Sequence, residues 1–283
     1  MEFRSFHFSA GPVYSALVGL TARRRLPVPL RIAAYRAFAR AVGADLGEAE
    51  LDLRAYSSLG DLFARRLRPG VRTVDPALDA IISPCDGVLA ARGTAVDGAL
   101  VQAKGKNYQL DELLVDRELS ARLTGGEYAT IYLSPRDYHR VHTPIDARLV
   151  RYDYIPGALW PVNPLVASRR DRLLSRNERV VITLDAGRLG MMALVMVGAA
   201  GVGNIALEYA PQSVTWRAAG ERRRIEIDRQ IERGDELGAF RLGSTVVMVF
   251  QPGRIQLAGE VGTALRFGER IGSVKTPGRG GAS

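Results

Sequence analysis

Short β-rich runs separated by Gly, Pro and Asp fill most of the chain from about residue 79 onward. Examples are Ile81-Ile82, Val88-Leu89, Tyr128 to Leu133, Leu149 to Ile155, Val180 to Leu184, Met191 to Val197 and Val246 to Phe250. Runs this short, bounded by turn residues, are typical of antiparallel sheets, because such sheets can join neighbouring strands through tight turns. The pattern predicts a mainly antiparallel β core, interrupted by one helix over 110–123.

The region before this core has a helical pattern instead. After Pro29 the run LRIAAYRAFARAV contains no Gly or Pro and places its apolar residues at helical spacing. Residues 53–68 continue in the same style and end at Pro69-Gly70, a stop signal. The sequence therefore predicts an α+β fold with a basic helical segment over 1–70, a β-rich domain over 71–272 and a Gly-rich flexible tail over 273–283.

The charge of the chain is concentrated near its start. The chain carries 39 basic and 30 acidic residues, a net charge of +9. Arginines outnumber acids in residues 1–40, where Glu2 is the sole carboxylate. This balance favours an acidic partner such as nucleic acid, anionic lipid or a phosphorylated substrate. The single cysteine, Cys85, excludes an internal disulfide and any cysteine-cluster metal site.

One apolar stretch, Leu189 to Leu207, is long enough to cross a bilayer. Four glycines punctuate it, and the residues before it read as a strand over 180–184 followed by a turn over 185–188. Two buried strands joined by that turn explain the segment better than a membrane helix. We therefore expect no integral membrane span.

Two histidines, His139 and His142, lie in the segment SPRDYHRVHTPIDA, directly after the strand-like run YATIYL. Pro135 and Pro144 bracket them, which predicts a loop at the end of a strand. Taken alone, the pair could simply make surface hydrogen bonds. A zinc site would need carboxylates to complete its shell, because the third histidine, His7, lies near the N-terminus and one cysteine is present. We expect no metal site.

Two further segments carry groups that could react together with a histidine. The turn Ser83-Pro84-Cys85-Asp86-Gly87 displays a carboxylate, and the bend GAFRLGST places Gly243 and Ser244 ahead of the strand-like VVMVF. Each alone reads as ordinary turn chemistry. Together an Asp, a His and a Ser are the parts of a relay that activates a hydroxyl. The sequence does not show whether they meet in space.

These segments resemble the proenzymes of the pyruvoyl-dependent phosphatidylserine decarboxylase family. The similarity runs from the segment FARRLRPG, which begins at Phe63, to Phe250, most of the chain. The matching stretches are SPCDG, AKGKNYQLDELL, PRDYHRVHTP, LWPVNP, NERVV, VGAAGVGNI and RGDELGAFRLGSTVV. The tetrapeptide Leu242-Gly243-Ser244-Thr245 combined with the paired-histidine loop is highly specific.

The resemblance implies roles for four catalytic residues, Asp86, His139, His142 and Ser244. The hydroxyl of Ser244 attacks the carbonyl of Gly243, and the chain is cut between these two residues. His142 is the base that takes the hydroxyl proton, and Asp86 orients it. The former Ser244 becomes the pyruvoyl cofactor, a covalent form of pyruvate. His139 protonates the product, although the sequence would fit the two histidines equally well with their roles exchanged.

The resemblance also implies a reaction and partners. The pyruvoyl ketone forms a Schiff base with the head-group amine of phosphatidylserine, and loss of carbon dioxide gives phosphatidylethanolamine. The cleaved α and β chains stay together as a heterodimer, and whether they form a higher oligomer is left open. Because the substrate lies in an anionic membrane, the basic N-terminal segment is expected to attach peripherally to the cytoplasmic side of the cell membrane, although it could instead pack as a solvated helix on the β core.

Two other functions compete with this interpretation. A hydrolase could use Ser244, His142 and Asp86 on an external substrate, in which case the chain would stay intact. A basic module could bind nucleic acid. The second is disfavoured, because the sequence has no stripe of alternating aromatic and basic residues and its arginines gather at one end. No nucleic-acid partner is therefore expected.

Overall fold

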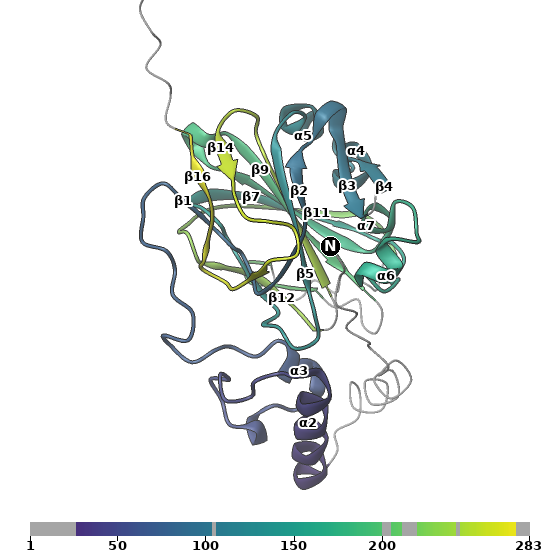
Figure 1. Ribbon diagram of the computed structural model, residues 1–283, viewed down its shortest axis with the longest axis vertical. Helices are drawn as coiled ribbons and strands as arrows, with labels where there is room; N and C mark the ends of the chain where they lie inside the picture. Colours follow the sequence, from purple (N-terminus) through teal and green to yellow (C-terminus); the bar gives the residue numbers. More distant parts are fainter. Residues whose placement is uncertain (1–26, 104–105, 200–204, 211–219, 242–243, 276–283) are drawn as a thin grey trace, which may run out of the picture.

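The computed structural model describes residues 27–103, 106–199, 205–210, 220–241 and 244–275. Its body is an eight-stranded sheet in the order β11-β7-β8-β9-β13-β5-β2-β15, with antiparallel neighbours throughout (Figure 1). In that order the strands are Arg223–Ile231, Ala147–Ile155, Arg179–Asp185, Met191–Gly198, Ser244–Phe250, Glu127–Leu133, Gly87–Thr94 and Ala264–Leu265. The predicted α+β fold with a mainly antiparallel core is confirmed.

Both faces of this sheet are buried, which explains why its central strands are apolar without alternation. Every residue of β13 is buried. Val246 and Met248 contribute to one apolar cluster, whereas Val247 and Val249 contribute to the other. Successive side chains of a strand point to opposite faces, so the two clusters are the two sides of the sheet.

Two small sheets cover one of these faces, since their apolar residues belong to the same cluster as Val246. One has the order β1-β16-β14, and the other has the order β10-β12-β6. These strands are, in the same order, Ala80–Ile82, Arg270–Val274, Ile255–Leu257, Ile205–Leu207, Glu236–Phe240 and Arg140–His142. β16 thus continues to Val274, two residues beyond the domain boundary expected at residue 272.

Short helices cover the opposite face, beside the hairpin of β3 and β4 (Figure 1). The elements on this side are β3 (Ala99–Ala103), β4 (Lys106–Gln109), α4 (Leu110–Leu114), α5 (Arg117–Leu123), α6 (Pro164–Ala167) and α7 (Leu173–Arg176). The expected single helix over 110–123 is therefore wrong. Val115 has a left-handed backbone with φ 51°, and Asp116 caps a new helix by accepting a bond from the amide of Leu119.

The apolar stretch Leu189 to Leu207 forms β9 and β10, with residues 200–204 between them outside the described part. The residues before it form β8, which pairs with β9 as the predicted hairpin. Within the described residues, no helix has the length and apolar character needed to cross a membrane.

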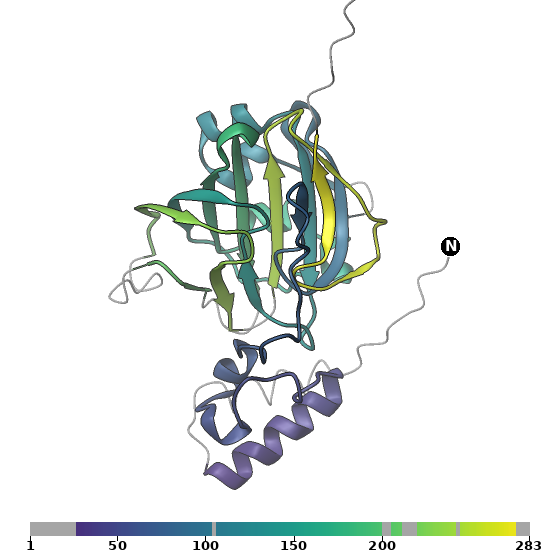
Figure 2. The same cartoon turned by 90° about the vertical axis from the view of Figure 1, so that its left-hand side faces the viewer.

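The N-terminal helices lie at one end of the β core (Figures 1 and 2). They are α2 (Val28–Val42), the short 3-10 turn η1 (Leu53–Ala55) and α3 (Leu59–Phe63), and they have an apolar cluster of their own that includes Tyr35, Phe38 and Phe63. Helix is less extensive than predicted over 53–68, because α3 ends at Phe63. Residues 1–26 of the predicted basic segment over 1–70, with His7, lie outside the described part and are not placed.

Candidate active site

The histidine segment lies against the Asp86 turn. It contains the short strand β6, where the sequence predicted a loop. The amide of His142 donates to the carbonyl oxygen of Pro84 at 2.8 Å. A Cβ on Gly87 would lie 2.5 Å from the carbonyl oxygen of Tyr132, so only glycine lets this turn pass so close to the end of β5. Two of the three predicted segments are therefore neighbours.

Ser244 joins them through β12, which pairs with β6. His142 lies opposite Glu236 in this pair, and the amide of Phe240 donates to the carbonyl oxygen of His139 at 2.9 Å. The chain then passes through residues 242–243, which include Gly243 and are not described, and enters β13 at Ser244. The end of β12 that adjoins the histidine segment thus leads directly to Ser244.

The Ser244 side chain is completely buried between β5 and β9. Its hydroxyl makes no hydrogen bond with any residue that the structure describes. A buried hydroxyl without a partner is unfavourable, and such groups in folded proteins call for an explanation such as a chemical role. The serine is thus fully desolvated and unpaired at the expected cleavage position.

His142 is held on both ring nitrogens. Its Nδ1 lies 2.8 Å from the carbonyl oxygen of Gly234, and its Nε2 lies 3.0 Å from the hydroxyl of Tyr138. Because a carbonyl can only accept, Nδ1 carries the proton and Nε2 has the lone pair that accepts from the hydroxyl. Burial lowers the pKa of His142 to about 4, so the ring is neutral at neutral pH.

The structure differs from the expected hydrogen bond between Asp86 and His142. Both carboxylate oxygens of Asp86 face Arg72, with Nη2–Oδ2 and Nε–Oδ1 distances of 2.6 and 3.0 Å. Arg72 also binds Glu48, with two distances of 3.0 Å. A fork of guanidinium donors matches a carboxylate better than a single imidazole nitrogen does, which explains why Asp86 takes this partner. The carbonyl of Gly234, and not Asp86, fixes the tautomer of His142.

Asp86 and His142 are nevertheless connected through Phe267. The amide of Phe267 donates to Oδ1 of Asp86 at 2.8 Å. Its ring stacks on the His142 ring, with centroids 3.8 Å apart and an angle of 16° between the planes. The charge of Asp86 also raises the pKa of His142, although less than burial lowers it. Asp86 therefore acts on His142 through a stacked ring and through its charge.

His139 has the same tautomer but an open nitrogen. Its Nδ1 donates to the carbonyl oxygen of Asp137 at 2.8 Å, while its buried Nε2 has no partner within the described ranges. The edge of its ring meets Phe63 of α3, with centroids 4.2 Å apart. Burial lowers the pKa of His139 to about 3, and the charge of Arg65 lowers it further against the effect of the Asp137 bond. The free lone pair makes His139 a neutral base or hydrogen-bond acceptor.

Sequence reasoning missed four groups that shape this site: Arg72, Gly234, Tyr138 and Phe267. Arg72 and Phe267 are distant in sequence from the histidines, and no local pattern marks them. Tyr138 lay within the resemblance segment PRDYHRVHTP but received no role. Among the described residues, no group of three or more His, Cys, Asp or Glu side chains could hold a metal ion.

Comparison with known proteins places these residues in a family. The family model described as phosphatidylserine decarboxylase matches residues 59–273. The chain belongs to the phosphatidylserine decarboxylase family. A proenzyme from Anaeromyxobacter sp. (strain K) is 44% identical over 264 residues, covering 91% of this chain and 93% of the relative. Its counterpart from Myxococcus xanthus (strain DK1622) is 40% identical over 262 residues, with 92% and 93% covered. Both are named phosphatidylserine decarboxylase proenzymes.

Membership in the family implies a self-processing proenzyme and a pyruvoyl cofactor. Among the described residues, Ser244 is compatible with such a group: it begins β13, its side chain is completely buried, and its hydroxyl has no hydrogen-bond partner in the part of the chain that the structure describes.

Proposed function

We propose that this protein is a phosphatidylserine decarboxylase that cuts its own chain between Gly243 and Ser244 and turns Ser244 into its pyruvoyl group. The observation that carries this assignment is the buried, unpartnered hydroxyl of Ser244 at the end of the connection from β12. A hydrolase acting on an external substrate would need this hydroxyl to be accessible. A hydroxyl that attacks the preceding carbonyl needs no such access.

The proposed cleavage begins with attack of the Ser244 hydroxyl on the carbonyl carbon of Gly243. His142 takes the hydroxyl proton at Nε2, for which the bond from Nδ1 to Gly234 leaves the required lone pair. The C–N bond then breaks, the amine takes up a proton, and an ester links the two residues. Removal of the Ser244 Cα proton releases Gly243 as a carboxylate, and water converts the remaining dehydroalanine into the pyruvoyl group and ammonia.

Asp86, in this proposal, supports the protonated state of His142 during the attack. A negative charge near an imidazolium favours it, and Asp86 is held in place by Arg72 and the Phe267 amide. Before the reaction, the hydroxyl of Tyr138 is hydrogen-bonded to Nε2 of His142. This hydroxyl must therefore either move away from Nε2 or transfer the Ser244 proton to it.

Once formed, the pyruvoyl group supplies an electron sink for decarboxylation of the serine head group. Proton delivery to the product is assigned to His139. Its buried Nε2 is free of partners, so a proton held there would face no competing acceptor. Because burial lowers the pKa of His139 to about 3, the ring is neutral at neutral pH, so it would first take up a proton during the reaction and then release it to the product.

Mass spectrometry of the purified protein tests the proposal. We expect one piece covering residues 1–243 and one covering 244–283 with a keto group in place of its N-terminal amine. Ser244→Ala should remain a single, inactive chain. Ser244→Cys, which keeps a nucleophile of similar size, should be cut slowly through a thioester. An active parent protein that is uncut, or cleavage of Ser244→Ala at this position, contradicts the proposal.

Peripheral binding to an anionic membrane, on the cytoplasmic side, is the second part of the proposal. It is supported by the cluster Arg23-Arg24-Arg25, since each arginine near an anionic surface contributes about 1 kcal/mol. A deletion should spare α2, because Tyr35 and Phe38 belong to the apolar cluster of the N-terminal helices. We expect a chain lacking residues 1–26 to sediment less with anionic vesicles than the full chain, and neither to bind neutral vesicles. Equal sedimentation of both chains would exclude this role for the segment.

The two cleaved chains are proposed to remain together as a heterodimer. β13 begins the smaller piece, and both of its neighbours in the sheet, β5 and β9, belong to the larger piece. Size-exclusion chromatography of the processed protein should give one peak containing both pieces, and its mass would also report any higher oligomer.

A further inference from the structure

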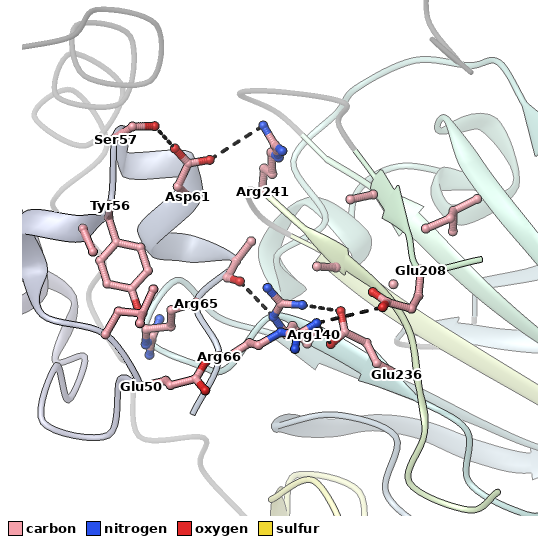
Figure 3. A pocket seen from close by; sticks show the side chains of 17 residues that line it. Glu50, Tyr56, Ser57, Asp61, Arg65, Arg66, Arg140, Glu208, Glu236 and Arg241 are labelled. Carbon is pink, nitrogen blue, oxygen red and sulfur yellow. Dashed lines mark hydrogen bonds and ion pairs between the residues drawn. The ribbon is translucent and has the colours of Figure 1, made fainter. Parts of the chain in front are cut away.

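A pocket of about 430 Å³ lies between the N-terminal helices and the small sheet of β10, β12 and β6 (Figure 3). Tyr56 and Arg65 line it from the helical side, and Arg140, Gly238 and Ala206 line it from the sheet. It has room for a small polar ligand such as a phospholipid head group.

Most charged side chains around this pocket already have partners. Arg140 and Arg66 both pair with Glu236, the latter at 3.6 Å. Arg241 lies 3.8 Å from Asp61, as Figure 3 shows. The opposite charges within each pair neutralise each other, so these side chains have little net charge with which to attract a ligand.

Arg65 is the exception. Only 4% of its surface is exposed, and in the described residues no carboxylate forms an ion pair with it. Its Nη2 makes one long bond of 3.5 Å to the carbonyl oxygen of Arg136, and its Nε has no partner. Burial lowers the pKa of Arg65, and the charges of Glu48 and Asp86 raise it by less, so these carboxylates compensate the buried charge only in part. A guanidinium nevertheless stays charged in proteins. A buried charge of this kind is unfavourable unless an anion compensates it.

Tyr56 offers a second unsatisfied donor in the same wall. It is 6% exposed, and its hydroxyl lies near the backbone of Leu51 without making a hydrogen bond of standard geometry. The charge of Arg65 lowers its pKa, although burial raises it more. Figure 3 shows the two side chains next to each other. The Nε of Arg65 and the hydroxyl of Tyr56 have no acceptor among the described residues, and a ligand rich in acceptor oxygens could supply one.

This wall adjoins the candidate active site. Arg65 is close enough to His139 to lower its pKa, and Phe63, two residues earlier, contacts the His139 ring. On the sheet side, Arg241 lines the pocket and precedes Ser244 by three residues. A head group reacting at residue 244 would therefore have this pocket beside it.

We propose that this pocket binds the phosphate of the lipid head group, with Arg65 and Tyr56 donating to its oxygens. The inference rests on the proposed function. Phosphate suits the site better than the serine carboxylate, because the carboxylate leaves as neutral carbon dioxide. A guanidinium bound to the carboxylate would stabilise the charged substrate and oppose the reaction, whereas the phosphate keeps its charge throughout. Glu50, the carboxylate at the pocket without an ion pair among the described residues, is exposed, so water screens it.

The test measures binding apart from turnover. Full-length Ser244→Ala protein, which should stay uncut, is titrated by calorimetry with glycerophosphoserine, glycerophosphoethanolamine and inorganic phosphate. Arg65→Gln should weaken binding of both glycerophosphodiesters about 10- to 100-fold, and Tyr56→Phe about 3- to 10-fold. Tyr56→Phe removes an unsatisfied hydroxyl, so its fold should be at least as stable. Arg66→Gln is the matched control, since Arg66 lines the same pocket but is 54% exposed and paired with Glu236.

Each other outcome overturns the inference. Equal affinity of all variants for the diesters, or no binding by the Ser244→Ala protein, excludes the site. A loss seen with glycerophosphoserine alone would mean that Arg65 binds the carboxylate. Inorganic phosphate binding as tightly as the diesters would mean a free-phosphate site. In the processed protein, Arg65→Gln should raise KM with self-cleavage unchanged, so failure of cleavage in the parent would count against the proposed function and not against this site.

Discussion

Two polar regions of this molecule lie side by side and differ in how well they are satisfied. In the first, made of Arg72, Asp86, Phe267, His142 and Tyr138, the carboxylate of Asp86 and both nitrogens of His142 are bonded. In the second, made of Ser244, His139, Arg65 and Tyr56, each side chain has a buried polar atom without a partner in the described part of the chain.

The difference indicates a division between support and reaction. Satisfied buried networks fix geometry, because every change breaks a bond. Unsatisfied buried atoms are unfavourable and persist where they serve binding or chemistry. We therefore expect the first region to set stability and to orient His142 as the base of self-cleavage, and the second region to carry the reacting hydroxyl and to bind and transform the substrate.

The largest effects should come from the two histidines, one in each region. His142→Ala should slow self-cleavage about 10²- to 10⁴-fold, because no base remains to take the Ser244 proton. His139→Ala should still be cut but decarboxylate poorly. Cleavage is followed by gel electrophoresis over time, and carbon dioxide release is measured on the processed protein.

Tyr138→Phe sharpens this test. It removes the hydroxyl bonded to Nε2 of His142 and leaves the ring in place. If the hydroxyl only occupies that nitrogen, cleavage should continue or become faster. Loss of cleavage in His139→Ala, with normal cleavage in His142→Ala, would transfer the base role to the open histidine.

Replacing Arg72 and replacing Arg65 should have different effects on the free energy of unfolding. Arg72→Met leaves the buried carboxylate of Asp86 without its cation and should lower the free energy of unfolding by about 3–5 kcal/mol. Arg65→Met removes a buried charge that has no ion-pair partner among the described residues, so the change should be within about 1 kcal/mol or stabilising. Urea denaturation in the uncut Ser244→Ala background measures both. Adding Asp86→Leu to Arg72→Met should restore part of the lost free energy of unfolding. If Arg72→Met and Arg65→Met lose the same free energy of unfolding, the two regions do not differ in the way described.

The stability of the protein should also depend on pH, through its two buried histidines. The pKa values of His139 and His142 are lowered to about 3 and about 4, below the ordinary histidine value. As pH falls below about 6.5, the unfolded chain binds protons that the folded chain does not, so stability decreases toward pH 4 by up to about 1.4 kcal/mol per pH unit for each histidine. This contribution is fully present above pH 6.5.

Histidine-to-glutamine variants isolate this effect. Burial raises the pKa of Asp137 and Glu236, so these carboxylates act in the opposite direction, but they are common to parent and variant. His142→Gln and His139→Gln should each flatten the loss of stability between about pH 6.5 and about pH 5. An unchanged slope in either variant would mean that its histidine is not buried in the neutral form.

Sequence alone determined the antiparallel β character of the core and several of its strands, and it supplied the candidate residues for the chemistry. Strand runs such as Val180 to Leu184 and Met191 to Val197 are local patterns, and the structure pairs them as expected. The helix predicted over 110–123 failed, because the left-handed backbone at Val115 lies in a stretch whose composition favours helix. The roles of Asp86, His139, His142 and Ser244 remain predictions that came from the family resemblance.

Tertiary structure decided which of these groups are bonded and which are left open. The partners of Asp86 and His142 are Arg72, Phe267 and Gly234, which come from distant parts of the chain. Arg65 and Arg72 look alike in the sequence, yet one meets two carboxylates and the other meets none in the described residues. Hydrogen bonding and burial depend on which segments the fold brings together, and a local sequence pattern does not predict these long-range contacts.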